Sequence, residues 1–387
     1  MKIKLDDELS LNPTKIKVLG VGGGGCNAVD TMIKESVSGV DFIACNTDIQ
    51  ALSLSEAPFK LPLGKKITKG LGAGGDPEIG RQAAEEDSDK IRAVLESSDM
   101  VFITAGMGGG TGTGAAPVIA SIAAEMGVLC VGVVTKPFAF EGKKKAKLAS
   151  EGIKKMREYV DTLIVVPNEN LFKTAKQGTK VSEAFEMVDG VLRDAVQGIS
   201  DLITRPGKIN IDFADVKRVM RNKGYALMGT GSASGANRAI DAITSAINNP
   251  LLENIQLEKA KGLLINISCS SDFTLKEYAD IMDIINTNNN TDDDFEMIIG
   301  TSIDSSLGEV VKVTVVAAGF AGSHEDVVDD SKKKPSTAGE YLTLDKWDKV
   351  IRGEQEPGER VDLFSGSIDS GNSELDIPAI FRRRSRK

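Results

Sequence analysis

The run 106–114 is the segment of this chain whose residue types best suit the binding of an anion. It reads Gly-Met-Gly-Gly-Gly-Thr-Gly-Thr-Gly and lies between an apolar run, 100–104, and a helix-like run that begins at Ala115. Glycines leave successive backbone N–H groups open to a phosphate, and the positive end of the following helix adds to the attraction. Thr111 and Thr113 add hydroxyl donors. The pattern predicts a strand, a phosphate-binding loop and a helix.

Two more glycine-rich loops lie upstream, at 20–27 and 70–77. The first has the spacing G-x-G-x-x-G, which is typical of dinucleotide folds when an acidic residue closes the next strand, and Asp48 nearly fits that place. One such turn is enough for a dinucleotide, so three loops favour a longer polyphosphate. The sequence lacks the motif G-x-x-x-x-G-K-[ST], so the protein is not an ordinary P-loop NTPase.

Alternating apolar and helical runs in the first half predict a parallel sheet with helices on both faces. We expect strands at 15–19, 41–45, 100–104, 129–134 and 162–166, and helices at 79–96, 115–126 and 146–160. Ligands of such sheets bind beyond the carboxyl ends of the strands, where all three glycine loops fall.

A long amphipathic helix follows at 179–205, where apolar residues recur every three or four positions until a Pro-Gly pair ends the pattern. Beyond it we expect a second unit with helices near 213–222 and 235–248 and strands at 262–268, 296–302 and 310–317. The fold class is therefore α/β: a parallel-sheet nucleotide-binding domain, a central helix, a smaller α/β domain and a disordered tail.

Composition places the chain among cytoplasmic proteins with a packed core. It has 387 residues, of which 41% are hydrophobic, enough for more than one domain. The formal net charge of −9 argues against nucleic-acid binding as the main activity. The four cysteines are far apart, so neither a disulfide framework nor a metal site held by the protein is expected. No signal-like or membrane-spanning run is present, so direct membrane insertion is not expected.

Five ordered segments resemble the tubulin/FtsZ family of GTPases. They are GGGTGTG at 108–114, GVGGGGCNAV at 20–29, NTD at 46–48, TKPF at 135–138 and ITRPGKINIDFADV at 203–216. The resemblance implies a GTP-hydrolysing cytoskeletal protein that binds GTP/GDP and polymerises head-to-tail into the filaments of the division ring. It also implies a flexible segment at 1–14, a GTP-binding domain at 15–178, a connecting helix at 179–205 and a second, GTPase-activating domain at 206–320.

The resemblance also assigns residues to the nucleotide. Asp189 would face the N1–H and N2–H₂ donors of guanine, and Phe185 would stack on the base, although periodicity alone makes Phe185 a core aromatic. Glu141 would contact the ribose. Lys145 stands where many members carry arginine; a lysine keeps the positive charge but lacks arginine's bidentate fork. The other residues placed around GTP are Gly22, Gly23, Gly24, Gly25, Cys26, Asn27, Asn46, Ala73, Gly74, Gly75, Asp76, Gly106, Gly108, Gly109, Gly110, Thr111, Gly112, Thr113, Gly114, Thr135 and Asn168.

The catalytic residues implied by the resemblance are Asn210, Asp212 and Asp215. Spacing alone favours a plainer interpretation, a helix N-cap followed by an acidic first turn. In tubulin-like filaments, however, this loop of one subunit reaches the γ-phosphate held by the next and orients the attacking water. Phosphoryl transfer depends on positioning and on Mg²⁺ that bridges phosphate oxygens, so hydrolysis should require assembly.

The last part of the chain changes composition. Residues 321–374 are acidic and poor in apolar side chains, which predicts a disordered linker. The apolar and basic end, 375–387, resembles the family's terminal motif, and residues 375–384 would dock on membrane-tethering and regulatory division proteins. The protein would thus concentrate at the division site, near the inner face of the membrane. The basic end also permits contact with anionic lipid, which by itself gives only marginal binding.

Three alternatives stay open at this point. A nicotinamide-dependent Rossmann oxidoreductase would use the first glycine loop, but it leaves the run 106–114 unexplained and lacks an acid for hydride transfer, because the single histidine, His324, falls in the linker. A nucleotide-binding scaffold without hydrolysis is disfavoured by Asp212 and Asp215. A plasmid-segregating or cell-shape relative of the same superfamily is disfavoured by the loop at 210–216 and by the terminal motif.

Overall fold

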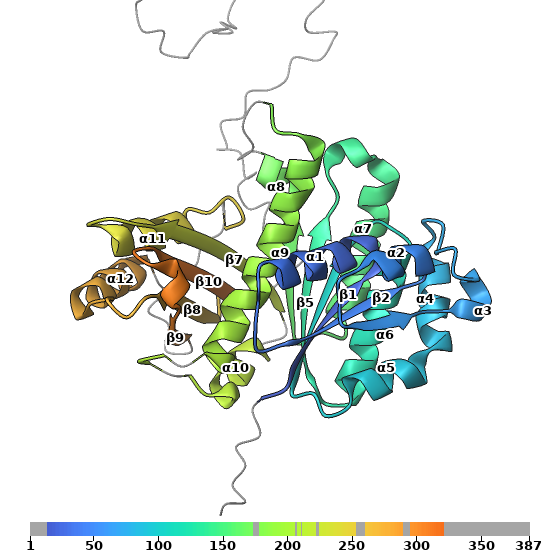
Figure 1. Ribbon diagram of the computed structural model, residues 1–387, viewed down its shortest axis with the longest axis horizontal. Helices are drawn as coiled ribbons and strands as arrows, with labels where there is room; N and C mark the ends of the chain where they lie inside the picture. The colour runs from blue at the N-terminus through green and yellow to red at the C-terminus, as the bar shows by residue number, and fades with distance from the viewer. Residues whose placement is uncertain are drawn as a thin grey trace, which may run out of the picture. The chain divides into compact units, whose positions relative to one another are not determined.

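The computed structural model describes residues 14–172, 178–205, 207–209, 211–221, 224–252, 260–288 and 295–320 (Figure 1). The strands are β1 (Ile16–Val21), β2 (Asp41–Asn46), β3 (Phe59–Pro62), β4 (Met100–Gly106), β5 (Leu129–Lys136), β6 (Thr162–Pro167), β7 (Gly224–Ala233), β8 (Gly262–Cys269), β9 (Glu296–Ile303) and β10 (Val311–Phe320). The α-helices are α1 (Gly22–Lys34), α2 (Ile49–Leu54), α3 (Lys65–Thr68), α4 (Pro77–Glu86), α5 (Ser88–Leu95), α6 (Thr111–Glu125), α7 (Lys143–Arg157), α8 (Asn168–Phe172), α9 (Val181–Thr204), α10 (Phe213–Met220), α11 (Arg238–Ile247) and α12 (Leu275–Asn288).

One ten-stranded sheet runs through the described chain in the order β3-β2-β1-β4-β5-β6-β7-β10-β8-β9. Pairing is parallel from β3 to β7, β10 is antiparallel to both of its neighbours, and β8 pairs in parallel with the edge strand β9. The predicted fold class, a parallel nucleotide-binding sheet followed by a second α/β part, is confirmed. All described residues belong to one compact unit, and the predicted domain boundaries stay a prediction.

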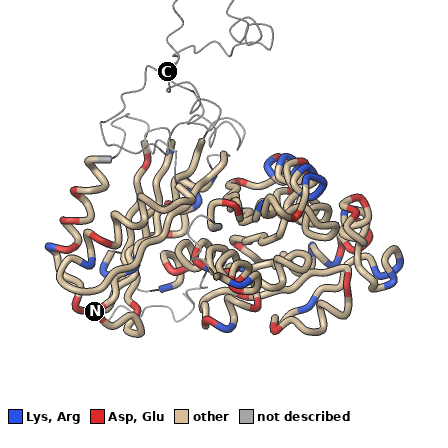
Figure 2. Tube along the Cα trace, turned by 90° about the horizontal axis from the view of Figure 1, so that it is seen from above, with Lys and Arg blue, Asp and Glu red and all other residues tan. Residues whose placement is uncertain are grey.

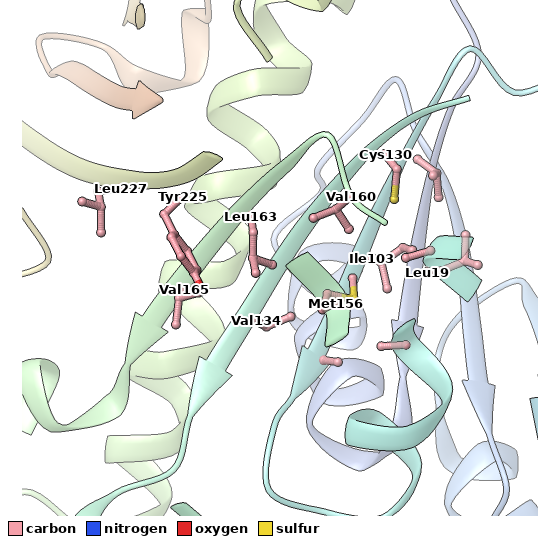
Figure 3. Close-up of a cluster of buried hydrophobic side chains, with 14 of the residues drawn as sticks. Leu19, Ile103, Cys130, Val134, Met156, Val160, Leu163, Val165, Tyr225 and Leu227 are labelled. Atoms are coloured by element: carbon pink, nitrogen blue, oxygen red, sulfur yellow. The ribbon is translucent and has the colours of Figure 1, made fainter. Parts of the chain in front are cut away.

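Helices cover both faces of the sheet, so it has two hydrophobic cores. On one face, side chains of β1, β4 and β5 pack against α5, α6 and α7. Ile103 of β4 and Met156 of α7 belong to this core (Figure 3). On the other, the same strands pack against α1 and α9, through residues such as Met32 and Leu192. A sheet buried on both faces explains why its strands read as continuous apolar runs.

The central helix α9 spans 24 residues and agrees with the predicted segment 179–205 within two residues. A helix of this length is about 36 Å long. In Figure 1 it runs from the neighbourhood of α8 at one end to that of α10 at the other. Residues near its start and residues just after its end therefore lie at opposite ends of this helix.

The predicted helix 79–96 is wrong as a single element, because α4 ends at Glu86 and α5 begins at Ser88. Asp87 between them is buried, and its Oδ2 accepts a hydrogen bond of 2.7 Å from the Gly64 N–H. Its side chain thus holds another loop, and its backbone at φ −106° and ψ 22° interrupts the helix. Strand β7 and helix α12 are absent from the prediction.

Charged residues of both signs are interspersed along the described chain (Figure 2). Among the described residues, no helix is long and apolar enough to cross a membrane, and no cluster of three or more His, Cys, Asp and Glu side chains could hold a metal ion. All four cysteines are buried and free, and the proposed linker, 321–374, and terminal peptide, 375–387, lie outside the described residues.

Candidate nucleotide-binding and catalytic sites

Two glycine loops meet at the carboxyl ends of β1 and β4. A Cβ placed on Gly22, whose φ is +73°, would lie 2.8 Å from the backbone nitrogen of Gly112, so the first turns of α1 and α6 are in direct contact. Neither helix has a side chain of the described chain capping its N-terminus. The uncapped N–H groups of two adjoining helices make a strong anion site.

The third glycine loop, 70–76, interlocks with the run 106–114. A Cβ on Gly110 would lie 2.8 Å from the Ala73 Cβ and 3.0 Å from the Asp76 nitrogen, and one on Gly114 would lie 2.0 Å from the Pro77 carbonyl oxygen. Residues with a side chain cannot make these approaches. The glycines therefore have two uses: some expose N–H groups, and others let the loops pack.

The two threonines of the run 106–114 bond to the protein itself. The Gly108 N–H donates a 2.8 Å hydrogen bond to the Oγ1 of Thr113, which is buried, and the hydroxyls of Thr111 and Thr47 are 2.6 Å apart. Both hydroxyls thus help to hold the loop in its shape. A threonine that accepts a bond can still donate its own proton to a phosphate.

A cavity of about 420 Å³ opens beside these loops. Twelve of the 25 predicted nucleotide ligands line it: Gly23, Gly24, Asn27, Gly106, Gly108, Gly109, Thr135, Glu141, Lys145, Asn168, Phe185 and Asp189. They come from elements far apart in the sequence, β4, β5, α1, α7, α8 and α9 among them. The other predicted ligands, such as Asn46 and the residues of the loop at 73–76, are not in its lining.

Two observations agree with the prediction that the cavity holds a nucleotide. The side-chain Oδ1 of Asn168, a residue only 3% exposed, has no hydrogen-bond partner among the described residues, and Asn168 lines the cavity. A buried acceptor of this kind needs a donor. A Cβ on Gly23 or Gly109 would meet nothing within 4 Å, so the backbone there is open to a ligand.

Phe185 is not a core residue, contrary to the interpretation from periodicity alone. It is 41% exposed, and its ring lies edge-on to the buried Phe138 at 5.5 Å between centroids. Phe138 also stacks on Phe140 at 4.9 Å. The exposed fraction and the cavity lining leave one face of Phe185 available to stack on a base.

Asp189 follows Phe185 by four residues, about one turn further along α9, and stands next to Val188 in the cavity lining. Burial, followed by the charges of Glu186 and Asp30, raises the pKa of Asp189 to about 7. Two N–H donors that approach such a carboxyl group stabilise its charged form through hydrogen bonds. The guanine edge offers such donors, whereas adenine presents an acceptor at N1.

This pKa predicts that guanine-nucleotide affinity depends on pH. Below about pH 7 the Asp189 carboxyl is protonated in the free protein, so GDP affinity should fall about tenfold per pH unit, while above pH 8 it should be flat. Calorimetric titration of GDP between pH 5.5 and 8.5 measures this. The variant Asp189→Asn shows how much of the pH dependence of GDP affinity is due to the phosphates alone. The same pH dependence in both proteins would contradict the assignment of Asp189 to the guanine edge.

Glu141 and Lys145 bond to each other across one turn of helix, 3.0 Å from Nζ to Oε2. The second oxygen of Glu141 accepts the Phe138 N–H at 3.0 Å, which closes the short turn before α7. The carboxylate is therefore fixed at the cavity wall. Lys145 is half exposed, and its ammonium can move from Glu141 to a phosphate with little cost.

Several predicted ligands have structural tasks in the described chain. Asp76 caps α4 by accepting the Glu78 N–H at 2.9 Å, and Asn46 accepts the Asp48 N–H at 3.3 Å. The Cys26 thiol contacts the carbonyl oxygens of Gly20 and Cys45 at 3.6 and 3.7 Å. Burial raises the pKa of Cys26 to about 12, so the thiol stays protonated.

The oxidoreductase alternative loses its acidic residue in the structure. Asp48 caps α2, because its Oδ1 accepts the N–H groups of Gln50 and Ala51 at 2.8 and 3.1 Å. It is therefore engaged by its own chain instead of presenting both oxygens to a ribose. His324 lies outside the described residues.

The predicted catalytic acids lie at the opposite end of α9. Asp212 is exposed and caps α10, with its Oδ1 2.8 Å from the Asp215 nitrogen, so the cap interpretation is confirmed. Asp215 pairs with Arg218 at 3.1 Å on the surface. Neither acid lines the nucleotide cavity of its own chain. Asn210 lies outside the described residues.

The packing of α7 against α6 depends on Gly152. A Cβ there would lie 2.5 Å from Thr113 Cγ2 and 3.3 Å from Met107 Sδ, both in the phosphate loop. We expect Gly152→Ala to lower the unfolding temperature and to weaken GDP binding roughly tenfold, because the clash outweighs the gain of about 1 kcal/mol in helix propensity. Thermal unfolding and calorimetry measure both. Gly190→Ala in α9, with nothing within 4 Å, is the matched control and should stabilise the protein.

Sequence reasoning missed four residues of the cavity wall: Met107, Pro137, Val188 and Leu192. Met107 and Pro137 stand inside segments already assigned to the nucleotide, so their position in those segments was the available signal. Val188 and Leu192 belong to the apolar stripe of α9, which periodicity assigns to the core. Both are buried, and both line the cavity.

Family models match both parts of the described chain. The model of the tubulin/FtsZ family GTPase domain matches residues 15–176, and the model of the FtsZ family C-terminal domain matches residues 224–321. The first match contains the glycine loops, and the second contains β7 to β10. Fold and site thus define the class, a tubulin-type GTPase with its C-terminal domain.

Individual proteins give the finer assignment. The cell division protein FtsZ of Buchnera aphidicola is 47% identical over 385 residues, with 97% of this chain and 98% of that protein covered. The cell division protein FtsZ of Pseudomonas putida is 51% identical over 400 residues, with 98% and 99% covered. The chain belongs to the FtsZ family of cell-division GTPases. It binds GTP and GDP and hydrolyses GTP.

Solved structures agree with this assignment. An FtsZ dimer of M. jannaschii, solved empty, has a TM-score of 0.76 at 42% identity and covers 80% of this chain and 90% of its own. CetZ2 of Haloferax volcanii, solved as a GTPγS-bound protofilament, has a TM-score of 0.68 at 21% identity over 87% of this chain and all of its own. The second likeness supports the fold alone.

Proposed function

We propose that this GTPase polymerises head-to-tail and that each active site is completed by the neighbouring subunit. One observation carries the proposal: Asp189, the proposed base ligand, lines the cavity near the start of α9, whereas Asp212 follows the end of the same helix. The 15 residues from Asp189 to Thr204 alone span roughly 22 Å. Asp212 therefore cannot reach the nucleotide of its own chain, although it can reach that of a copy stacked on this end.

The chemistry at such a junction needs little basicity. Hydrolysis of the γ-phosphate depends on holding a water in line and on neutralising charge. One subunit's N–H groups at α1 and α6 would hold the phosphates, and Asp212 and Asp215 of the next would orient the water. Mg²⁺, bound together with GTP, would supply positive charge that stabilises the transferring phosphate. Because the contact repeats without closing, it generates a filament.

Filaments of this kind would form the division ring. Relatives named cell division protein FtsZ support this role, as does the likeness to an FtsZ dimer. The terminal peptide, 375–384, would connect the filament to membrane-tethering and regulatory division proteins and so keep it at the division site.

Deletion of 375–387 should leave GTP hydrolysis intact and abolish localisation to the division site in cells. Fluorescence microscopy of a labelled chain measures this localisation.

Phosphate release tests the shared active site. GTP hydrolysis per protein molecule should be low at low protein concentration and rise steeply above an assembly threshold, together with light scattering. ATP should give neither signal. Hydrolysis per molecule that is independent of protein concentration would contradict the proposal, and scattering without release would indicate a scaffold that lacks hydrolysis.

A further inference from the structure

The edge strand β9 holds the segment that precedes the proposed catalytic acids. Thr301 in this strand is only 7% exposed, and its Oγ1 accepts hydrogen bonds from the backbone N–H groups of Lys208 and Ile209, both at 3.1 Å. The Thr301 N–H in turn donates to the Ile209 carbonyl oxygen at 3.2 Å. A single residue therefore makes three hydrogen bonds to the segment.

Close packing fixes the register of the segment on both sides of these bonds. A Cβ on Gly207 would lie 1.6 Å from the Thr301 carbonyl oxygen, so the backbone lies directly on the strand. The Ile211 side chain occupies the space above Gly300, where a Cβ would be 2.6 Å from Ile211 Cδ1. A shift by one residue would bring a side chain against the Thr301 carbonyl oxygen and would move Ile211 away from the space above Gly300.

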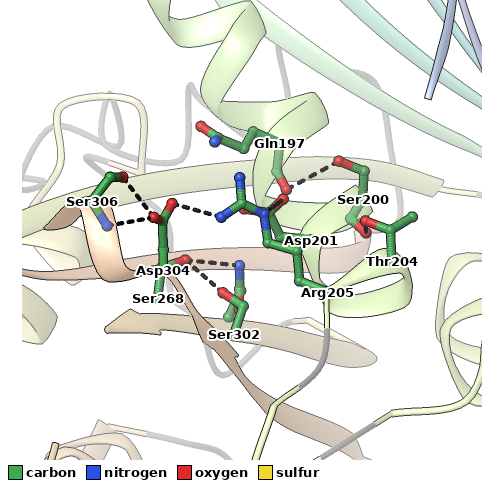
Figure 4. A network of polar contacts seen from close by, with 10 residues as sticks. Gln197, Ser200, Asp201, Thr204, Arg205, Ser268, Ser302, Asp304 and Ser306 are labelled. Atoms are coloured by element: carbon green, nitrogen blue, oxygen red, sulfur yellow. Dashed lines mark hydrogen bonds and ion pairs between the residues drawn. The ribbon is translucent and has the colours of Figure 1, made fainter. Parts of the chain in front are cut away.

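Ion pairs between described residues lie at both ends of this region. Arg205 pairs with Asp304 at 2.6 Å and with Asp201 at 2.9 Å (Figure 4). Arg218 of α10 pairs with Glu296 at 3.0 Å, and both side chains are exposed. The exposed Arg218–Glu296 pair holds geometry weakly, whereas the mostly buried pairs of Arg205 fix the chain where α9 ends. Between these two ends, the buried hydroxyl of Thr301 holds the backbone N–H groups of Lys208 and Ile209.

We propose that Thr301 is a positioning residue for GTP hydrolysis, which fixes the backbone before Asp212 so that this carboxylate faces the neighbouring subunit's nucleotide correctly. The inference rests on the proposed function, since Thr301 touches no nucleotide. Asp212 is exposed and is placed only by the backbone that leads to it. A displacement of about 1 Å in such a group can cost a factor of about 100 in rate.

Three variants separate this role from a general structural one. Thr301→Val keeps the shape and removes the acceptor, and Thr301→Ser keeps the acceptor. Ser302→Ala is the matched control, because it removes a buried hydroxyl from the same strand that bonds to Ser268 and Asn266 instead of the segment. If Thr301→Val fails to fold, Thr301→Ala replaces it.

The readouts are amide hydrogen exchange at Lys208 and Ile209, GTP turnover of assembled protein at saturating GTP, GDP affinity and the amount of pelleted polymer. In Thr301→Val we expect faster exchange at the two amides and a turnover reduced roughly 10- to 100-fold. KM, GDP affinity and polymer mass should stay at the wild-type values. Thr301→Ser and Ser302→Ala should behave as wild type.

Wild-type turnover in Thr301→Val would overturn the inference, as would unchanged exchange at the two amides or an equal loss in Ser302→Ala. The proposed function is tested separately by Asp212→Asn. If Asp212→Asn keeps full hydrolysis, the shared active site fails. If it loses hydrolysis while Thr301→Val does not, only the positioning role fails.

Discussion

Replacement of Asp212 by asparagine should lower GTP turnover by about 10²- to 10³-fold, the loss expected when a water-orienting carboxylate is removed. Asparagine caps a helix as well as aspartate does, so the 2.8 Å bond to the Asp215 N–H should persist. GDP affinity should not change, because Asp212 does not line the cavity of its own chain. Phosphate release and calorimetry measure the two quantities.

Asp212→Ala separates the charge from the cap. It should lose hydrolysis to the same extent and, in addition, cost about 1 kcal/mol of unfolding free energy through the lost cap. If alanine abolished turnover and asparagine preserved it, the residue would act only as a helix cap. The plainer interpretation of the spacing would then be sufficient.

Asp189→Asn should weaken GTP binding by about 100-fold or more, since it removes a charge-assisted pair of hydrogen bonds to the guanine edge. Xanthine carries an oxygen in place of the 2-amino group, so the asparagine amide can donate to it. The variant should therefore prefer XTP over GTP, and competition of both nucleotides for a fluorescent analogue measures this. An unchanged preference for GTP would move base recognition away from Asp189.

The same substitution has an opposite effect on the free protein. The raised pKa means that the folded chain holds a proton on Asp189 more tightly than the unfolded chain between about pH 4 and pH 7. That contribution to stability is present at low pH and is lost as pH rises to about 7. Asp189→Asn removes the desolvated charge, so at pH 8 the nucleotide-free variant should unfold at a higher temperature than wild type.

The sequence predicted the elements whose burial is visible in the local pattern of apolar residues. Apolar runs gave the parallel strands, and the three- and four-residue spacing gave α9 almost to its ends. Strand β7 was missed because glycines interrupt its apolar pattern. Gly229 and Gly231 are needed there because a Cβ on either would lie only 2.1 Å from a backbone carbonyl oxygen of α11. The break between α4 and α5 at Asp87 depends on a hydrogen bond from the distant Gly64 N–H, which the local periodicity of the sequence cannot predict.

The sequence predicts a site only where a residue type has one characteristic chemistry. Glycine loops indicated phosphate binding, and the family resemblance supplied Asp189 and Phe185. Sequence could not show that Thr113 braces its own loop, or that Thr301, almost ninety residues beyond Asp212, holds the segment before it. Such roles come from contacts between distant segments, which the fold creates.

A mixing experiment tests the shared active site most directly. Asp212→Ala has an intact nucleotide cavity and a defective loop, whereas Asp189→Asn has an intact loop and a defective cavity. At a GTP concentration that saturates only the first, an equimolar mixture should release phosphate at roughly a quarter of the wild-type rate, because one random head-to-tail junction in four combines the two intact halves. A mixture no more active than the sum of the separate variants would show that each subunit hydrolyses only its own nucleotide.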